Sequence, residues 1–342
     1  MGRSTTAGIQ AEIAKGVFRP HTALTNMALA YYQNASNYFA KAIFPTCPVS
    51  LSSDNYYIFS REDLLRDNWQ RKPAYGKVSP TVVGEATETY VCHVDQMIMG
   101  IDQIRQTDLT RRQGPSVIQP KQQRTRTIAE QANIHQDRLF AEKYFKAGAW
   151  KNEKEGVDST APSTGQFIKF SNDNSDPIAF VDNEKTEMNQ ISGRTPNRLA
   201  LGINVFNSLK VHPAVLERVK YGGSTANPAS VTENVLAQLF EVEKVAVMKS
   251  IMNKADMGAD EDMQYIGDPN AFLLAYATNT PSIDEPSAGY IFTWDMLGNG
   301  QMLPILNYLG ENGTHTEYIE GLMATDMKKT SDDLARFYKA AV

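Results

Sequence analysis

The alternation of apolar and polar residues is clearest in two short segments of the first third of the chain. Residues 55–60 (NYYIFS) and 89–101 (TYVCHVDQMIMGI) are rich in aromatic and aliphatic residues, and in the second segment Tyr90 and Cys92 share one face. Both patterns predict β-strands. Between them, the 26 residues 61–86 are polar and contain Pro and Gly. Because a two-stranded ribbon with so long a loop is marginal alone, we predict a projecting hairpin stabilised by another molecule.

Two later segments have the pattern of helices. Residues 120–147 carry a rough apolar stripe that Gly148 ends. About 28 residues at ~1.5 Å each make a rod of roughly 40 Å, which is long for a globular helix. Residues 176–193 predict a second helix, because Asp176 suits the N-cap and Pro177 suits the first helical position.

The second half of the chain interleaves predicted strands and helices. Short apolar runs indicate strands, and an apolar face behind a capping Thr indicates one of the helices. The spacing after residue 244 is typical of hairpins, so we expect a mixed sheet. The predicted strands are 198–203, 244–252, 271–277, 289–294 and 317–325, and the predicted helices are 212–223 and 232–240. The last residues, 332–342, fit either a strand or a short helix.

The N-terminal part is apolar and aromatic without a sustained period. Residues 17–48 are interrupted by Asn, Gln, Thr and Pro, and they carry no formal charge from Pro20 to Ala40. Too many polar groups are present for a membrane span. A helical period extends only from about Asn34 to Ile43. We therefore predict an extended arm with a short helix that lies on an apolar surface.

Composition excludes several classes of protein. The chain has 342 residues, of which 42% are hydrophobic and 21% charged, and this balance is that of an ordinary globular protein. Two Cys cannot make a disulfide framework, and no apolar signal core opens the chain, so we expect a reduced, cytosolic assembly site. Residues 1–150 hold 18 Lys and Arg against 13 Asp and Glu, a net charge of +5. The remaining 16 and 26 give residues 151–342 a net charge of -10, and together these make the overall -5. This asymmetry suggests that the two parts meet different partners.

The sequence contains no catalytic, cofactor or metal signature. It lacks a nucleophile elbow, a zinc-protease helix, a phosphate loop and a dinucleotide fingerprint. Its five His and two Cys are not spaced as zinc ligands. The acidic run 256–262 lacks the ligand spacing of a calcium loop and is interpreted as a solvated loop. We therefore predict that the protein is not an enzyme and binds no cofactor or metal.

Candidate binding residues come from the arm, the long loop and a basic run. Large aromatics are frequent interface anchors, and the loop has little core of its own. We predict inter-subunit contacts through Tyr31, Tyr38, Trp69, Tyr75 and Lys77. The basic run fits contact with DNA phosphates, an acidic surface of a neighbouring subunit, or solvent. It consists of Arg105, Arg111, Arg112, Lys121, Arg124 and Arg126.

The order of these parts resembles the major capsid proteins of tailed double-stranded DNA bacteriophages, which have the Hong Kong 97-type fold. The resemblance is carried by LALGINVFNSLKVHPAVLERVKYGG (199–223), TENVLAQLFEVEKVAVMKSIMNKA (232–255), GDPNAFLLAYA (267–277) and PSAGYIFTW (286–294). It implies an α+β capsid fold with an N-terminal arm, an extended β-hairpin loop, a long spine helix, a peripheral domain and an axial domain. The implied boundaries are arm 1–53, extended loop 54–104, spine helix and peripheral domain 105–197, axial domain 198–312, and a return to the peripheral domain over 313–342.

The same resemblance implies a function and a set of partners. The chain would assemble as hexamers and pentamers into an icosahedral shell around phage DNA, and it would reside in the virion after assembly in the host bacterial cytoplasm. Implied partners are further copies of the chain, a scaffolding protein, a portal, a decoration protein and packaged double-stranded DNA held by non-specific contacts. No membrane is involved.

Three alternatives from other classes stay open. An encapsulin-like nanocompartment has a related fold and encloses protein cargo. A soluble enzyme would elute as a small oligomer without forming particles. A nucleic-acid-binding module using the basic run would lose affinity steeply with salt and would form no shell.

Overall fold

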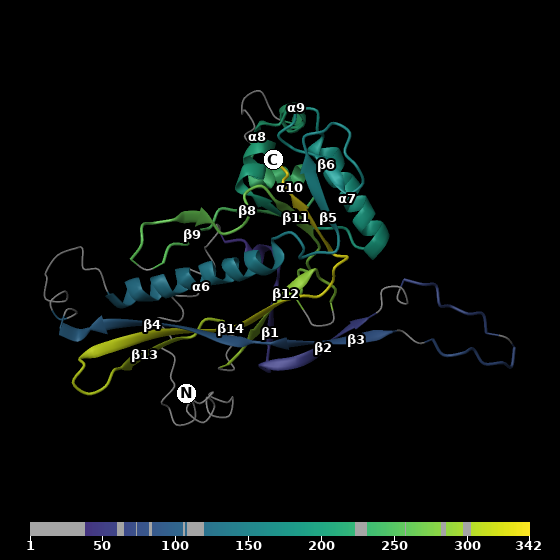
Figure 1. Cartoon of the computed structure of the whole chain (residues 1–342). Coiled ribbons are helices and arrows are strands. Elements are labelled where there is room, and N and C mark those ends of the chain that lie inside the picture. The colour runs from purple at the N-terminus through teal and green to yellow at the C-terminus, as the bar shows by residue number, and fades with distance from the viewer. Residues whose placement is uncertain are drawn as a thin grey trace.

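The fold is built around two mixed sheets, a long helix and two projecting ribbons (Figure 1). The computed structural model describes residues 38–342 except 60–64, 73, 82–83, 105–106, 108–119, 223–230, 257, 282–284 and 297–301. The six-stranded sheet and four helices make the upper body in Figure 1. The long helix α6 (Pro120–Tyr144) and the five-stranded sheet make the elongated lower body. This mixture confirms the predicted α+β class.

The five-stranded sheet has the long strand β14 (Thr316–Lys329) at its centre. Strand β4 (His93–Asp102) pairs antiparallel along one side of β14, and two strands share the other side. Those two are β12 (Gly289–Trp294) and β13 (Ile305–Leu309), and β1 (Thr46–Val49) pairs parallel with β12. Alternating side chains of β14 separate two cores. Ile319 and Met323 pack under α6, whereas Leu322 and Ala324 pack on the opposite face.

The six-stranded sheet is covered by four helices. Strand β11 (Phe272–Ala275) lies between β7 and β15 near the middle of the sheet and is buried along its whole length. The strand order is β6 (Gln166–Ile168), β5 (Glu153–Val157), β15 (Ala335–Lys339), β11, β7 (Arg198–Gly202) and β8 (Lys244–Met248). The helices are α7 (Pro177–Ser192), α8 (Ile203–Val211), α9 (Pro213–Gly222) and α10 (Glu233–Leu239).

Local signals explain where helix α7 begins and ends. The Asp176 carboxylate accepts hydrogen bonds from the backbone N–H groups of Ile178 and Ala179, and Pro177 occupies the first turn. Gly193 ends the helix with φ +68°, a left-handed conformation that favours glycine. The predicted helix over 176–193 is therefore confirmed nearly to the residue.

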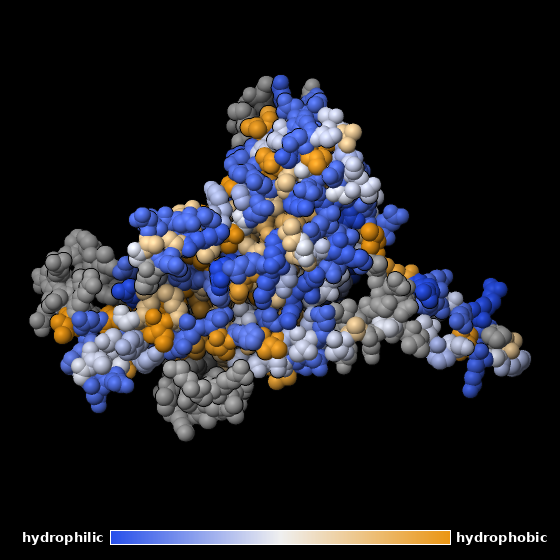
Figure 2. Space-filling view, viewed as in Figure 1, coloured by the Kyte–Doolittle hydropathy of each residue, from blue (hydrophilic) through white to orange (hydrophobic). Residues whose placement is uncertain are grey.

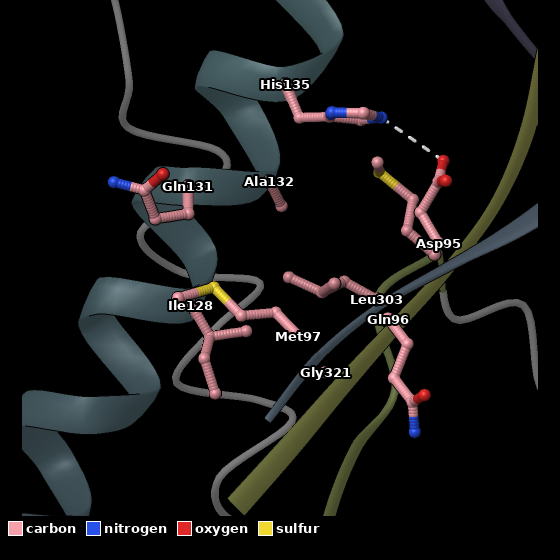
Figure 3. Close-up of a pocket in the computed structure, with 10 residues that line it drawn as sticks. Asp95, Gln96, Met97, Ile128, Gln131, Ala132, His135, Leu303 and Gly321 are labelled. Carbon is pink, nitrogen blue, oxygen red and sulfur yellow. Dashed lines mark hydrogen bonds and ion pairs between the residues drawn. The ribbon is translucent and has the colours of Figure 1, made fainter. Parts of the chain in front are cut away.

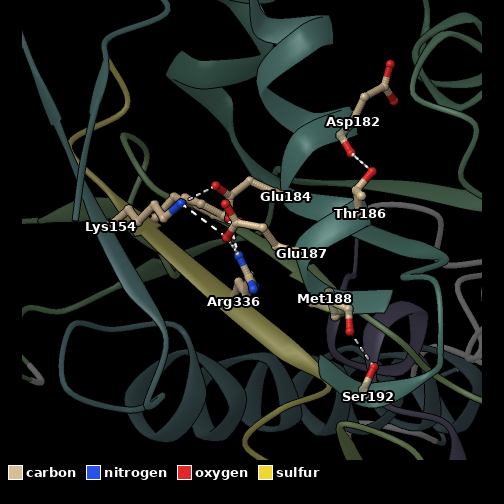
Figure 4. Close-up of polar contacts among 9 residues, drawn as sticks. Lys154, Asp182, Glu184, Thr186, Glu187, Met188, Ser192 and Arg336 are labelled. Atoms are coloured by element: carbon tan, nitrogen blue, oxygen red, sulfur yellow. Dashed lines mark hydrogen bonds and ion pairs between the residues drawn. The ribbon is translucent and has the colours of Figure 1, made fainter. Parts of the chain in front are cut away.

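A buried ion network attaches α7 to the six-stranded sheet (Figure 4). The Glu184 carboxylate, 2% exposed, accepts hydrogen bonds from Arg336 Nη1 and from the Tyr338 hydroxyl, both at 2.6 Å. Lys154 on β5 also pairs with Glu184, and Arg336 reaches Glu187 at 2.6 Å. These contacts join α7, β5 and β15 in one cluster, so removing the central carboxylate would leave the buried Arg336 with only the half-exposed Glu187 as its ionic partner.

A second buried junction joins the start of the described chain to α6. Helix α3 (Ala40–Ile43) is only four residues long, and its first N–H groups are capped by a distant carboxylate. Asp137 on α6 accepts from the N–H groups of Phe39 (3.2 Å) and Ala40 (3.0 Å) and from the Ser250 hydroxyl (2.7 Å). Burial raises the pKa of Asp137 to about 6, although these hydrogen bonds oppose the shift. The Asp137 carboxylate thus connects three distant parts of the chain.

Two ribbons project from the body. Strands β2 (Ser53–Phe59) and β3 (Glu85–Val91) pair antiparallel from Ser53↔Val91 to Phe59↔Glu85, which confirms the predicted hairpin. Strands β9 (Ile251–Asn253) and β10 (Met263–Tyr265) form the second ribbon, which has the acidic run at its tip. Both ribbons leave the body in Figure 1.

Several elements differ from the sequence predictions. The predicted strand 89–101 is split at Cys92, so that β3 stays in the hairpin while β4 crosses to β14. The predicted strand 244–252 is interrupted after Met248, and helix α8 was not predicted. Helix α6 ends at Tyr144 instead of residue 147, because its last turn is closed by the Trp150 indole N–H, which donates to the Tyr144 carbonyl at 2.8 Å. The ambiguous C-terminal segment forms strand β15.

Sheet membership also departs from the segment boundaries predicted along the chain. Strands β5 and β6, from the predicted peripheral segment 105–197, lie in the same sheet as β7, β8 and β11. Strand β15 from 313–342 joins that sheet too, whereas β12 and β13 from 198–312 pair with β14 in the other sheet. The difference arises because strand pairing is non-local, and a division by sequence position does not follow it.

Candidate assembly surfaces

The root of the β2–β3 hairpin is fixed on the five-stranded sheet. The Tyr90 ring stacks on Phe292 with centroids 4.7 Å apart, and Tyr56 packs against the same ring at 5.6 Å. The Val91 N–H donates to Asp326 Oδ2 at 3.0 Å, and both tyrosines are 2% exposed. The hairpin therefore leaves the body in a defined direction.

The described part of the loop of this hairpin exposes large side chains to solvent. Trp69 is 95% exposed and Tyr75 is fully exposed, and Lys77 is exposed as well. The backbone N–H of Trp69 donates to Asp67 Oδ1 at 3.1 Å, which is a local turn contact. Residues 65–81 carry four Lys or Arg and one Asp, a net charge of +3. Because large aromatics are frequent interface anchors, this part of the loop is a candidate contact surface.

Of the two predicted contact residues of the arm, the structure describes Tyr38 but not Tyr31. Tyr38 is half-buried, and its pKa is raised by burial and by the nearby carboxylates of Glu130 and Asp137. Tyr38 therefore lies near two carboxylates of α6, and its contact with another subunit stays a prediction. Tyr31 lies outside the described residues.

The basic run is partly neutralised within the chain. Lys121 Nζ pairs with Glu317 of β14 at 2.6 Å, and Arg126 pairs with Glu130 one turn further along α6 at 2.9 Å. Arg124 is half-buried on the same helix. The predicted residues Arg105, Arg111 and Arg112 lie outside the described part of the chain. Contact of this run with DNA phosphates therefore stays a prediction, while two of its members already have carboxylate partners.

A pocket of about 270 Å³ lies between α6 and the strands beneath it (Figure 3). Its floor is apolar and includes two methionines, Met97 on β4 and Met323 on β14. His135 Nε2 lies 3.2 Å from Asp95 Oδ2 at one side of the opening, as the dashed line in Figure 3 marks. The remaining lining residues are Gln96, Ile128, Gln131, Ala132, Leu303 and Gly321.

The sequence interpretation did not single out this pocket. Its helical side consists of Ile128, Gln131, Ala132 and His135, which follow the three- and four-residue spacing of one helix face. That spacing is the signal by which a surface along the helix was predictable. The facing strands were not predictable, because β4 and β14 are more than 200 residues apart in sequence.

The sheet below α6 exposes further apolar residues. Val94 and Ile98 on β4 are 44% and 46% exposed, and Tyr308 and Leu309 on β13 are 41% and 68% exposed. Figure 2 shows hydrophobic residues interspersed along the lower edge of the molecule, where this sheet lies. In the described residues β4 pairs only with β14, so its other edge presents unpaired backbone groups. Such an edge is a template for another chain.

The described residues lack two kinds of feature. They contain no group of three or more His, Cys, Asp or Glu side chains that could hold a metal ion. None of their helices is both long and apolar enough to cross a membrane. Cys47 and Cys92 are buried free thiols, and burial raises the pKa of both.

Comparison with known proteins identifies the fold. No family model matches the chain. A phage-related protein from Bordetella bronchiseptica superimposes with a TM-score of 0.69 over 94% of this chain and 97% of its own, at 20% sequence identity. The SrpI encapsulin of Synechococcus elongatus matches with a TM-score of 0.50 over 90% of this chain and 89% of its own, at 10% identity.

A curated relative adds a similarity in sequence. The major capsid protein of Burkholderia phage BcepMu is 34% identical over 83 residues, which are 24% of this chain. The chain has a capsid-type α+β fold. The resemblance to phage major capsid proteins predicted from the sequence is thus confirmed. The match spans only 26% of the length of that curated relative. This similarity alone therefore does not assign the relative's function to the chain.

Proposed function

We propose that this chain is the major capsid protein of a tailed double-stranded DNA phage, which assembles as hexamers and pentamers into an icosahedral shell. The observation that carries the proposal is the rooted hairpin with Trp69 and Tyr75 exposed at its far end. Copies related by rotation can place each such hairpin on the next subunit through head-to-tail contacts that close into rings. The sequence similarity to a phage major capsid protein supports the same role.

The proposal assigns the parts of the fold to roles in the shell. Helix α6 with the five-stranded sheet serves as the spine and peripheral domain, and the six-stranded sheet with α7–α10 serves as the axial domain around the capsomer axis. Residues 54–104 contain the extended loop, and residues before 54 form the arm. The function is structural rather than catalytic.

The proposed partners follow from that role. They are further copies of this chain, a scaffolding protein, a portal, a decoration protein and packaged DNA. Residues of the basic run, Arg124 among them, are candidates for non-specific phosphate contact. Assembly takes place in the host bacterial cytoplasm and the product resides in the virion.

A second candidate is an encapsulin-like compartment, which the likeness to the SrpI encapsulin favours. The two functions differ in what the shell encloses. Particles produced during phage growth and treated with nuclease should retain double-stranded DNA if the chain is a phage capsid protein. Particles that hold protein cargo and no DNA would instead identify a nanocompartment.

Removing the extended loop should abolish assembly while the fold is retained. Replacing residues 61–83 by Asn-Gly should close β2 and β3 through a two-residue turn, because this dipeptide suits that hairpin connection. We expect a folded protein with an unchanged far-ultraviolet circular dichroism spectrum and no shells by electron microscopy. Normal shells from this variant would contradict the proposed role of the loop. As a control, replacing the tip residues 257–260 of the β9–β10 ribbon by Gly-Ser should leave shells intact.

A further inference from the structure

The pocket beside α6 has the chemistry of a receptor for one aromatic side chain. Thioether sulfurs make favourable contacts with aromatic rings, and two of them, from Met97 and Met323, line the pocket. Asp95 supplies carboxylate oxygens at its opening that can accept from a ring N–H donor. A volume of about 270 Å³ suits a single large ring rather than a helix or a strand. An indole combines such a ring with an N–H donor.

The chain itself supplies that indole. Of its three tryptophans, Trp150 and Trp294 are 4% and 6% exposed, and their ring N–H groups donate to the carbonyls of Tyr144 and Ser50 at 2.8 and 3.1 Å. Trp69 is 95% exposed at the far end of the extended loop. Trp69 is thus the tryptophan whose apolar surface is not yet covered.

The structure places Trp69 away from the pocket of its own subunit. The pocket begins at Asp95 on β4, and β3 runs outward from it to Glu85 before the loop starts. At ~3.3 Å per residue, the 12 residues from Met97 to Glu85 extend roughly 40 Å, and the loop lies beyond that point. The β2–β3 ladder holds the loop away from the body, as Figure 1 shows. The indole that fills the pocket therefore comes from a second copy.

We propose that Trp69 of one subunit inserts into the pocket lined by Met97, Ile128 and Met323 of the next subunit. Charge favours the same arrangement, since Arg71 and Lys72 follow Trp69 closely in the sequence and the pocket has the Asp95 carboxylate at its opening. Each copy has one such side chain and one such pocket in different places, so the contact is head-to-tail and repeats around a ring. This inference rests on the proposed shell function and names the surface that receives the extended loop.

A cross-link between two separately purified variants tests the contact directly. Gln70→Cys places a thiol next to Trp69, and Gln131→Cys places one at the opening of the pocket. Mixing the two under mild oxidation during assembly should give a disulfide-linked dimer that neither forms alone. Lys143→Cys is the matched control, because it is exposed on the same helix about 18 Å further along. Cross-linking no stronger with Gln131→Cys than with Lys143→Cys would overturn the proposal.

Substitution of the anchor provides an independent measurement. Trp69→Ala should raise the protein concentration needed for shell formation by about tenfold or more, as expected for loss of an aromatic anchor. Trp69→Phe should keep most of the assembly, since a ring still fills the pocket. Equal assembly of wild type and Trp69→Ala would overturn the inference. Wild-type protein that never forms shells would instead refute the proposed function, so the two failures are distinguishable.

Discussion

Glu184→Ala should lower the free energy of unfolding by about 3–5 kcal/mol, the typical loss when one partner of a buried ion pair is removed. Arg336 is 4% exposed, and in this variant it would keep only Glu187, whose side chain is 51% exposed. The Tyr338 hydroxyl, which is fully buried, would also lose its acceptor. Urea unfolding followed by far-ultraviolet circular dichroism measures the difference.

The neighbouring carboxylate is the control for this prediction. Glu187→Ala removes a half-exposed partner of the same guanidinium, so we expect a loss of about 1 kcal/mol or less. The double replacement Glu184→Leu with Arg336→Met should recover part of the stability, because it leaves no unpaired charge in the core. Equal losses from Glu184→Ala and Glu187→Ala would show that burial does not decide the strength of this network.

The second large effect concerns pH and the junction at α3. The Nζ atom of Lys41 is buried, and burial lowers the pKa of Lys41 to about 6, although the Asp137 charge opposes the shift. An unfolded lysine has a pKa of about 10.4. A lysine whose pKa falls on folding contributes stability above the unfolded pKa, and that contribution is lost as pH falls toward the folded pKa. Between pH 6 and about pH 10.4 the unfolded state binds one more proton than the folded state, so the free energy of unfolding rises with pH.

The stability of the wild-type protein should therefore rise between pH 7 and pH 8 by about 1.4 kcal/mol more than that of Lys41→Met. Asp137 affects the free energy of unfolding at lower pH. Because its pKa is raised on folding, its contribution to stability is present below about pH 4 and is lost as the pH rises to about 6. The pKa of the buried Cys92 thiol is raised to about 12, so Cys92 lowers the free energy of unfolding as the pH rises, mainly above pH 8. Urea unfolding at the two pH values gives the comparison.

Lys146→Met provides the reference for this measurement, because Lys146 is exposed just after the end of α6. It should show the same pH dependence as the wild-type protein. A Lys41→Met variant with an unchanged slope would mean that Lys41 is not desolvated in the folded state. Because Met has a similar length and fits irregular space, the variant should also be more stable than the wild type at pH 7.

The parts of the fold that were predicted from sequence are those with local causes. Helix α7 follows from Asp176, Pro177 and Gly193, which lie within one segment and act on adjacent backbone groups. The β2–β3 hairpin follows from two alternating runs on either side of one loop. The exposure of Trp69 was also predictable, since its segment contains too few apolar residues to bury a ring.

The parts that were not predicted depend on contacts between distant residues. Cys92 breaks a run that looks continuous, because β3 pairs with β2 while β4 pairs with β14. Glu184 gave no signal of burial in sequence, as its cationic partners come from β5 and β15. The basic run illustrates the same limit, since Lys121 finds its carboxylate at Glu317, nearly 200 residues away.

By itself, the sequence determined the α+β class, the projecting hairpin, the long helix, the exposed aromatic loop and the resemblance to phage capsid proteins. Only the tertiary structure decided which strands share a sheet, which charges are neutralised within the subunit, and that a methionine-lined pocket opens beside α6. The physical reason is that propensity, capping and periodicity act over a few residues. Strand pairing, desolvation and pocket formation depend on segments that meet only after the chain has folded.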